Sequence, residues 1–156
     1  MDLDIFRKEY CPILKAMDQI GDKWSMLIMR ECFLGTRRFE DFYDHLGISK
    51  SVLSGKLKKM VDQGLLKKTP YQNEGERTRY EYRLTQKSRD FRKVLIGLLS
   101  WSNKYLVEEG NETMYILDSN DNPVHLEVVD DELNSVPLRE TRMVIKSKSG
   151  DRPSFV

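Results

Sequence analysis

The first half of the chain carries four segments in which apolar residues recur every three or four positions, the spacing of an amphipathic helix. The predicted helices span residues 12–20, 22–33, 39–46 and 49–63. Pro12 suits the first position of the first helix, and Asp22 and Ser49 suit amino-terminal caps. A glycine follows each segment within two residues, as is common after a helix. Because so few residues separate the third and fourth helices, this pair is predicted to form a helix-turn-helix.

A β-hairpin is predicted directly after the fourth helix. Residues 65–71 are expected to form its first strand, residues 72–76 a polar turn and residues 78–84 its second strand. In the second strand Tyr80 and Tyr82 alternate with charged residues, and this period of two indicates a half-buried strand. The order of helical core, helix-turn-helix and hairpin is that of a winged helix-turn-helix, with residues 71–79 of the hairpin as the wing.

A long helix is predicted from residue 85 to about residue 109, a length of about 36 Å at 1.5 Å per residue. Its apolar residues repeat at intervals of seven, like the seam of a coiled coil, and others give it a second apolar face. We therefore expect it to pack both on its own domain and on a second copy of the chain. The predicted dimerisation residues are Phe91, Val94, Leu98, Trp101 and Tyr105.

The sequence after residue 110 is predicted to be a small β-rich extension. Its apolar runs at 114–117, 124–129 and 142–145 indicate three short strands, and we recognise no internal repeat in the chain. Asp118 begins a segment that imitates a calcium-binding loop, but the positions that require glycine and glutamate hold other residues, so an Asx turn explains it better. The last residues, from about Lys146, are expected to be loose.

These patterns predict a mainly α, α+β fold. It consists of a winged helix-turn-helix with a long carboxyl-terminal dimerisation helix and the small β-rich extension. Residues 1–110 are expected to form the DNA-binding and dimerisation domain. Residues 111–156 are expected to form the acidic extension, without zinc ligands.

Composition narrows the classes of function. The 156 residues are 39% hydrophobic and 33% charged, which suits a folded domain with a small appendage. No run approaches the ~20 apolar residues of a membrane span, and the acidic start lacks the apolar core of a signal peptide, so we expect a cytoplasmic protein without a membrane partner. Two cysteines and two histidines form no pattern of metal ligands or catalytic residues, so we expect neither an enzyme nor a metal or other cofactor.

Positive charge is concentrated in the middle of the chain. Residues 48–93 carry 13 basic and 5 acidic side chains, a net charge of +8, whereas residues 111–156 carry a net charge of −4. Such a block is typical of a surface that binds a polyanion, and a solvated lysine-rich face is the alternative.

The fourth predicted helix has the features of a helix that enters the major groove. Small side chains near its start would let it approach base edges, and lysines around them suit phosphate contacts. Gly55 costs about 1 kcal/mol of helix stability relative to alanine, which either close approach to DNA or simple tolerance would explain. Arg77 and Arg79 can reach the adjacent minor groove or phosphates, although Glu74 and Glu76 oppose this and a merely solvated hairpin is the alternative. The predicted DNA contacts are Arg37, Arg38, Ser49, Lys50, Ser51, Val52, Ser54, Gly55, Lys56, Lys59, Arg77 and Arg79.

A series of short motifs runs in a fixed order through residues 8–108. They include Cys11-Pro12, Ile20-Gly21-Asp22-Lys23-Trp24, Gly35-Thr36-Arg37-Arg38-Phe39, Leu46-Gly47-Ile48-Ser49, Asp62-Gln63-Gly64-Leu65, Tyr80-Glu81-Tyr82-Arg83-Leu84-Thr85 and Trp101. As a set they resemble the HxlR-type winged helix-turn-helix transcriptional regulators. The resemblance implies a cytoplasmic bacterial or archaeal homodimer, joined through its first and last helices, that binds double-stranded operator DNA.

The resemblance also implies a redox- or electrophile-sensing role for the cysteine before Pro12, and hence an unidentified small-molecule or electrophile effector. At the start of a helix the thiolate of Cys11 would be stabilised by the helix dipole and by nearby lysines. The alternative is a small apolar residue at a dimer seam. Cys32, on the apolar face of the second helix, is expected to belong to the core.

Three classes of function compete. The first is a dimeric, sequence-specific DNA-binding regulator, and the second is a winged-helix module that binds protein or RNA without an operator. The third, a small enzyme, lacks any catalytic spacing in the sequence. The +8 block predicts that operator binding weakens steeply with salt, which the second class does not require.

Overall fold

The computed structural model describes residues 11–72, 75 and 77–143. Residues Ile13–Leu95 form one compact unit, and the residues from Ile96 onward, with Cys11 and Pro12, belong to a second. The first unit contains the helix-turn-helix and the hairpin. The predicted loose end after Lys146, and Glu74 and Glu76 of the hairpin tip, lie outside the described residues.

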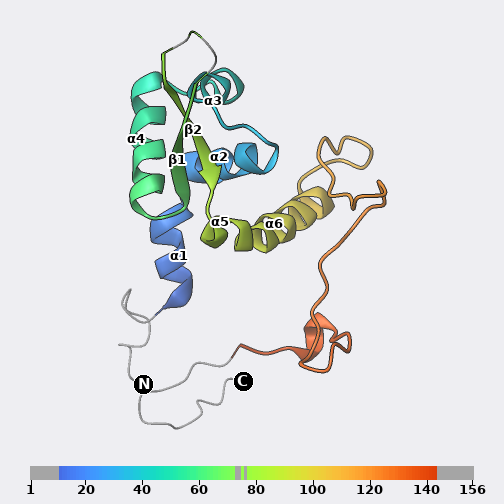
Figure 1. Cartoon of the computed structure of the whole chain (residues 1–156). Helices are drawn as coiled ribbons and strands as arrows, with labels where there is room; N and C mark the ends of the chain where they lie inside the picture. Colours follow the sequence, from blue (N-terminus) through green and yellow to red (C-terminus); the bar gives the residue numbers. More distant parts are fainter. Residues whose placement is uncertain (1–10, 73–74, 76, 144–156) are drawn as a thin grey trace, which may run out of the picture. The chain divides into compact units, whose positions relative to one another are not determined.

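The helices of the first unit follow the predicted order (Figure 1). They are α1 (Pro12–Ile20), α2 (Lys23–Phe33), α3 (Phe39–Leu46) and α4 (Lys50–Asp62). Asp22 caps α2 by accepting hydrogen bonds from the backbone N–H groups of Trp24 and Ser25, and Ser49 caps α4 by accepting one from Val52. Both predicted caps are confirmed. They satisfy N–H groups that have no partner within a helix.

Two glycines, Gly21 and Gly47, occupy connections between these helices where a residue with a Cβ atom would fit poorly. Gly47 ends α3 with a φ of 60°, a left-handed conformation that residues with a Cβ rarely adopt. At Gly21 a Cβ atom would lie 2.6 Å from the carbonyl oxygen of Met17. A larger residue there would therefore clash with the last turn of α1.

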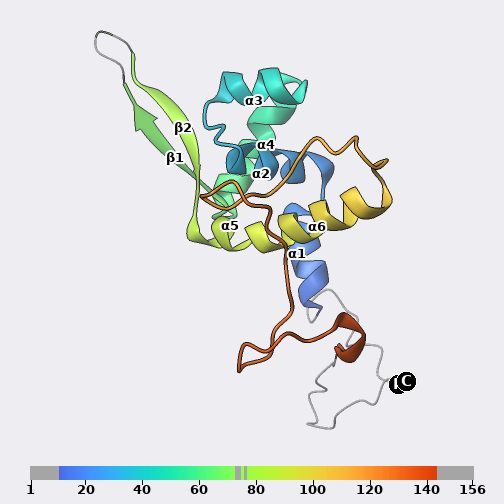
Figure 2. The same cartoon turned by 90° about the vertical axis from the view of Figure 1, so that its right-hand side faces the viewer.

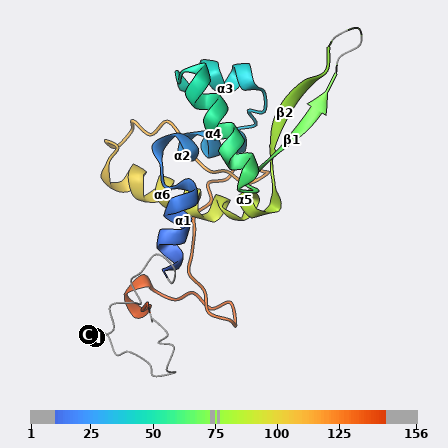
Figure 3. The ribbon, with the colours of Figure 1, turned by 90° about the vertical axis from the view of Figure 1, so that its left-hand side faces the viewer.

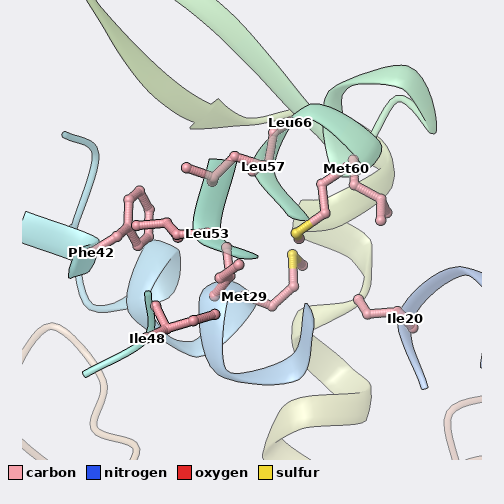
Figure 4. Close-up of a cluster of buried hydrophobic side chains, with 10 residues drawn as sticks. Ile20, Met29, Phe42, Ile48, Leu53, Leu57, Met60 and Leu66 are labelled. Carbon is pink, nitrogen blue, oxygen red and sulfur yellow. The ribbon is translucent and has the colours of Figure 1, made fainter. Parts of the chain in front are cut away.

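The core of the first unit gathers side chains from all four helices and the hairpin, as Figure 4 shows. It includes Ile20, Ile28, Met29, Phe42, Ile48, Leu53, Leu57, Met60, Leu65 and Leu66. Three of them come from one face of α4, so the opposite face of that helix points away from the core. Burial of each large side chain contributes about 1.5–3 kcal/mol, which fixes the orientation of α4.

The predicted hairpin is confirmed. Strand β1 (Leu66–Tyr71) pairs antiparallel with β2 (Arg79–Leu84), so that Leu66 lies opposite Leu84 and Tyr71 opposite Arg79. The carbonyl oxygen of Arg37 accepts a hydrogen bond from the N–H of Tyr82, which places the segment before α3 along the free edge of β2. Figures 2 and 3 show the hairpin projecting beyond α3 and α4, as a wing does.

The prediction of a single long helix from residue 85 to about residue 109 is wrong in two respects. The chain forms a short α5 (Gln86–Asp90) and then α6 (Arg92–Tyr105), which ends four residues earlier than predicted. At the junction the N–H of Phe91 bonds to the carbonyl of Ser88, three residues back, and the hydroxyl of buried Ser88 donates to the carbonyl of Leu65. These bonds tie α5 to the start of β1 and tighten the helix at Phe91.

The extension after residue 110 differs from the prediction. Among residues 111–143, the first two expected strands are replaced by two isolated bridges, Leu117 with Pro123 and Val129 with Ser135, and a short 3-10 helix forms at Leu138–Glu140. The second half of the third expected strand, 142–145, lies outside the described residues. Each bridge closes a turn around an aspartate that accepts backbone hydrogen bonds, so the predicted Asx turn at Asp118 is confirmed.

The two turns of the extension also reveal an internal repeat that the sequence prediction missed. The N–H of Val124 bonds to the carbonyl of Ile116, and the N–H of Val136 bonds to that of Val128, twelve residues further along. Asp130 accepts a hydrogen bond from the backbone N–H of Asn134. Asp118 accepts the same bond from the N–H of Asn122, also four residues further along. The repeat is short and retains few identical residues, so periodicity alone did not show it.

The fold is a winged helix-turn-helix, as predicted, with an extension built from turns. Among the described helices, none is long and apolar enough to cross a membrane.

Candidate nucleic-acid interface

Helix α4 offers its outer face to solvent. Leu53, Leu57 and Met60 are fully buried. The residues on the other side are exposed: Ser51, Val52, Ser54, Gly55, Lys58, Lys59 and Asp62. The spacing of the buried residues thus determines which side chains a duplex could meet.

The side chains at the start of this outer face of α4 are small. Ser49, Ser51 and Ser54 have small side chains, and a Cβ atom added to Gly55 would have no heavy atom within 4 Å. The packing of the fold therefore does not require glycine at position 55. This open space is compatible with both explanations that the sequence allows, close approach of a ligand and simple tolerance.

The lysines of α4 differ in their surroundings. Nζ of Lys56 lies 2.8 Å from a carboxylate oxygen of Asp22, and its side chain is only 23% exposed. Lys50 pairs with exposed Glu40 at 3.1 Å. Within the described part of the chain, Lys58 and Lys59 have no hydrogen-bond or ion-pair partner. Their charges are therefore available to an external anion.

The contact between Lys56 and Asp22 links α4 to the start of α2. The hydroxyl of Ser25 donates to the other oxygen of Asp22 at 2.6 Å. Partial burial alone would raise the pKa of Asp22, but the hydrogen bonds from Lys56 and Ser25 outweigh it and lower that pKa from 3.8 to about 2. Lys56, predicted as a DNA contact, thus also holds the helix-turn-helix together.

Tyrosine rings hold three cations on the helix-turn-helix and wing. Nζ of Lys68 lies 4.3 Å from the ring centre of Tyr80, and Cζ of Arg38 lies 4.9 Å from that of Tyr71. Lys50 lies 4.9 Å from the ring centre of Tyr43 on α3. Such contacts favour one position of a long, flexible cation.

A groove of about 670 Å³ separates the start of α3 from the hairpin. Arg38, Lys68 and Arg79 supply its positive charge, while Glu40 and Asp41 lie at the amino-terminal turn of α3. Arg37 and Arg77 are exposed nearby in sequence. The wing therefore brings together arginines that lie more than thirty residues apart in the chain.

Sequence reasoning missed Lys68 and the three supporting tyrosines. The alternation of the strands made Tyr80 and Tyr82 visible, but only as half-buried residues. The contact between Lys68 and Tyr80 crosses the two strands of the hairpin. Sequence could have indicated it only if the register of the two strands had been known.

Sequence reasoning also missed the partner of His45. That residue is exposed on α3, yet its Nδ1 lies 2.8 Å from buried Glu31 of α2. Thr36 and Arg30 donate to the same carboxylate. Burial alone would raise the pKa of Glu31, but these three contacts together lower it. The cluster joins α2 to α3.

The two cysteines have different environments. Cys11 is half-buried next to the first residue of α1, and both thiols are free. Cys32 packs against the core, where burial and the charge of Glu31 raise its pKa to about 12. The prediction that Cys32 is a core residue is confirmed, and its raised pKa favours the protonated thiol at neutral pH.

Helix α6 carries the predicted seam. Val94, Leu98, Trp101 and Tyr105 are each about half exposed or more, from 48% to 62%. The rings of Trp101 and Tyr105 contact each other with centres 5.9 Å apart. Phe91 differs from these four, because it packs against the core of its own chain.

The extension lies against another part of α6. Asn103 donates a hydrogen bond to the carbonyl of Met114, and Leu126 lies in van der Waals range of a Cβ at Gly97. The helix thus has one half-buried side and one exposed apolar side, as its two apolar faces predicted.

Comparisons with known proteins agree with this architecture. The model of the HxlR-like helix-turn-helix family matches residues 19–110. An uncharacterized HTH-type transcriptional regulator of Mycobacterium tuberculosis is 39% identical over 92 residues, which are 59% of this chain and 57% of that protein. The chain therefore matches little more than half the length of this relative.

Two solved structures are similar over most of the chain. PA1607, a candidate transcription factor, is 30% identical with a TM-score of 0.75, and the match covers 85% of this chain and 93% of that one. PA1374 of Pseudomonas aeruginosa, also a candidate transcription factor, is 30% identical with a TM-score of 0.62, covering 90% and 97%. Because the family model matches more than half of the sequence, over the helices and hairpin that carry the surface described above, the chain belongs to the HxlR-like helix-turn-helix family of transcriptional regulators.

Proposed function

We propose that the protein is a homodimeric regulator that binds double-stranded operator DNA in a sequence-specific manner. Helix α4 lies in the major groove, and the wing contacts the adjacent minor groove or its phosphates. The observation that carries this proposal is the outer face of α4, where small side chains at the start are followed by exposed Lys58 and Lys59.

The roles of the residues follow from their positions. Ser51, Val52 and Ser54 read base edges together with Gly55, because they are exposed and short. The charged residues contact phosphates and set position without reading sequence. These are Arg37, Arg38, Lys50, Lys56, Lys59, Arg77 and Arg79, to which the geometry adds Lys58 and Lys68.

A dimer gives this surface its specificity. In our proposal the exposed seam of α6 pairs with that of a second copy, and Ile13, Leu14 and Met17 of α1 extend the contact. Two copies related by a twofold axis then meet half-sites about one helical turn apart. We further propose a cytoplasmic location, where such DNA is found, and Cys11 as the thiol that responds to an oxidant or electrophile.

The alternative is a winged-helix module that binds protein or RNA. It shares the fold, but it gives no use to Gly55 or to the small residues around it. Binding to operator DNA is therefore the function that we propose.

A genomic footprint of the protein tests the proposal. We expect discrete protected sites with two related half-sites, including one near the gene that encodes the chain. Binding spread evenly over the genome, or confined to RNA, would contradict operator recognition.

A further inference from the structure

A second hollow lies at the base of the wing, on residues that our functional proposal leaves largely unused. Its volume is about 260 Å³, and Arg37, Lys67, Arg83 and Arg89 line it. No aspartate or glutamate is among the described residues of its lining. Four positive charges around one small volume repel each other unless an anion lies between them.

Two of the three arginines of this hollow are held in place by other groups. Arg83 donates through Nε to Glu81 at 2.5 Å, and Arg89 donates through Nη1 to the carbonyl of Leu84 at 2.9 Å. A guanidinium has five N–H donors, so each of these arginines retains donors for a ligand. Arg37 and Lys67 are exposed, and their charged groups have no partner in the part of the chain that the structure describes.

The remaining lining residues carry no charge of their own, and buried Glu31 lies next to two of them, Cys32 and Thr36. Cys32 is at the hollow with a protonated, neutral thiol, and Thr36 already donates its hydroxyl to Glu31. Leu84 and Tyr82 add apolar surface. A volume of about 260 Å³ suits a ligand of few atoms rather than a nucleotide or a larger effector.

The hollow also joins four segments of the first unit. Its cations come from the segment before α3, from β1, from β2 and from α5. A ligand bound to all four would fix the base of the wing to α5 and would neutralise Arg37, one of the proposed phosphate contacts.

We propose that this hollow binds a small anion with two or more negative charges, such as inorganic phosphate or a small polycarboxylate. Bound anion lowers the affinity of the protein for DNA. The binding site itself stands on the hollow alone, whereas the effect on DNA rests on the proposed function.

Calorimetry of the DNA-free, full-length chain tests the binding site. Phosphate and citrate are titrated separately, with ionic strength held constant by chloride, so the two arms distinguish a phosphoryl from a carboxylate ligand. We expect saturable binding of at least one of them, with one site per chain. Lys67→Gln and Arg89→Gln should each weaken it by about tenfold or more, since each removes a charged hydrogen bond.

Lys93→Gln is the matched control, because it removes one exposed positive charge that does not line the hollow. It should bind the anion as the unchanged protein does. Arg89 supports the backbone at Leu84, so thermal melting is measured for each variant, and Lys67→Gln keeps the test valid if Arg89→Gln unfolds. The absence of saturable heat for both anions, or an equal loss in Lys93→Gln, would overturn the site.

DNA binding in the same buffers separates this inference from the functional proposal. Phosphate or citrate should weaken DNA binding by the unchanged chain and not by Lys67→Gln. If the chain binds DNA but neither anion, the proposed anion site is wrong and the proposed DNA-binding function stands. If it binds an anion but no DNA, the anion site stands and the proposed DNA-binding function is wrong.

Discussion

Lys56 has a role in the fold beside the DNA contact that we propose for it. Its charge belongs to the positive block of the sequence, and sequence reasoning assigned it to DNA. The structure adds Asp22 as its partner at 2.8 Å. Sequence could predict Asp22 as a cap, because a cap is local, but the contact with Lys56 depends on how α4 packs on α2.

Asp22→Asn should destabilise the protein at neutral pH. The pKa of Asp22 is lowered from 3.8 to about 2, so its stabilisation is fully present above pH 4 and is lost as the pH falls through 2. Because the carboxyl group is partly exposed and solvent screens its charge, we expect Asp22→Asn to lower the free energy of unfolding at pH 7 by about 1–2 kcal/mol.

Urea unfolding of both proteins at pH 7 and at several values between pH 4 and pH 2 measures this effect. The difference between them should shrink toward the acid end. Asp62→Asn is the control, since Asp62 is exposed at the end of α4 and should change stability by less than about 0.5 kcal/mol. A difference that is constant with pH would contradict the assigned role of Asp22.

Gly55→Ala should make the protein more stable and bind its operator less well. The added methyl group meets no atom of the protein and gains about 1 kcal/mol of helix propensity. Against a base edge the same methyl group would overfill the contact, at a cost of about 1–3 kcal/mol. Urea unfolding and fluorescence anisotropy on operator DNA measure the two effects, and unchanged affinity would show that glycine is merely tolerated.

The elements divide into those that local signals determine and those that depend on distant contacts. The helices α1 to α4 and the hairpin follow from caps, glycines and periodicity, and the structure confirms them. The break at Phe91 does not, because its cause is the hydrogen bond between Ser88 and Leu65, which lie 23 residues apart. The extension was misjudged for a related reason: its apolar runs have β-like composition but find no paired strand in the described chain.

The wing should depend on its tyrosines for position and on its cations for charge. Tyr71→Leu and Tyr80→Leu each remove a ring that supports a cation, so we expect affinity for DNA to fall by about two- to fivefold. The slope of affinity against salt should stay the same, because no charge is lost. Lys68→Gln should instead reduce that slope by about one per wing.

Tyr115→Leu provides the comparison, since Tyr115 is 62% exposed outside the first unit and supports no cation among the described residues. Its affinity should equal that of the unchanged protein. If Tyr80→Leu lowered the salt slope as Lys68→Gln does, the separation of roles in the wing would be wrong.

The dimer that we propose depends on the exposed seam of α6. Sequence could predict this face from intervals of seven residues, and its exposure in the single chain agrees with the need for a partner. Sequence could not predict that one side of α6 contacts the extension while another side stays exposed. The extension has no periodic pattern that would indicate this contact.

Trp101→Glu should convert the protein from a dimer to a monomer. A buried charge in the seam and the loss of an aromatic contact cost about 2–4 kcal/mol, which raises the dissociation constant of the dimer at least about thirtyfold. Light scattering coupled to size exclusion measures the state, and Tyr115→Glu serves as the exposed aromatic control. A Trp101→Glu chain that stays dimeric at micromolar concentration would place the interface elsewhere.

The most direct test of the central claim is the affinity of the full chain for its footprinted duplex as salt rises from 50 to 200 mM. If lysines and arginines of α4 and the wing neutralise about six to ten phosphates per dimer, affinity should fall by about 10³- to 10⁵-fold, and Lys59→Gln should make the fall less steep. An affinity that is flat over this range would contradict DNA binding by this surface.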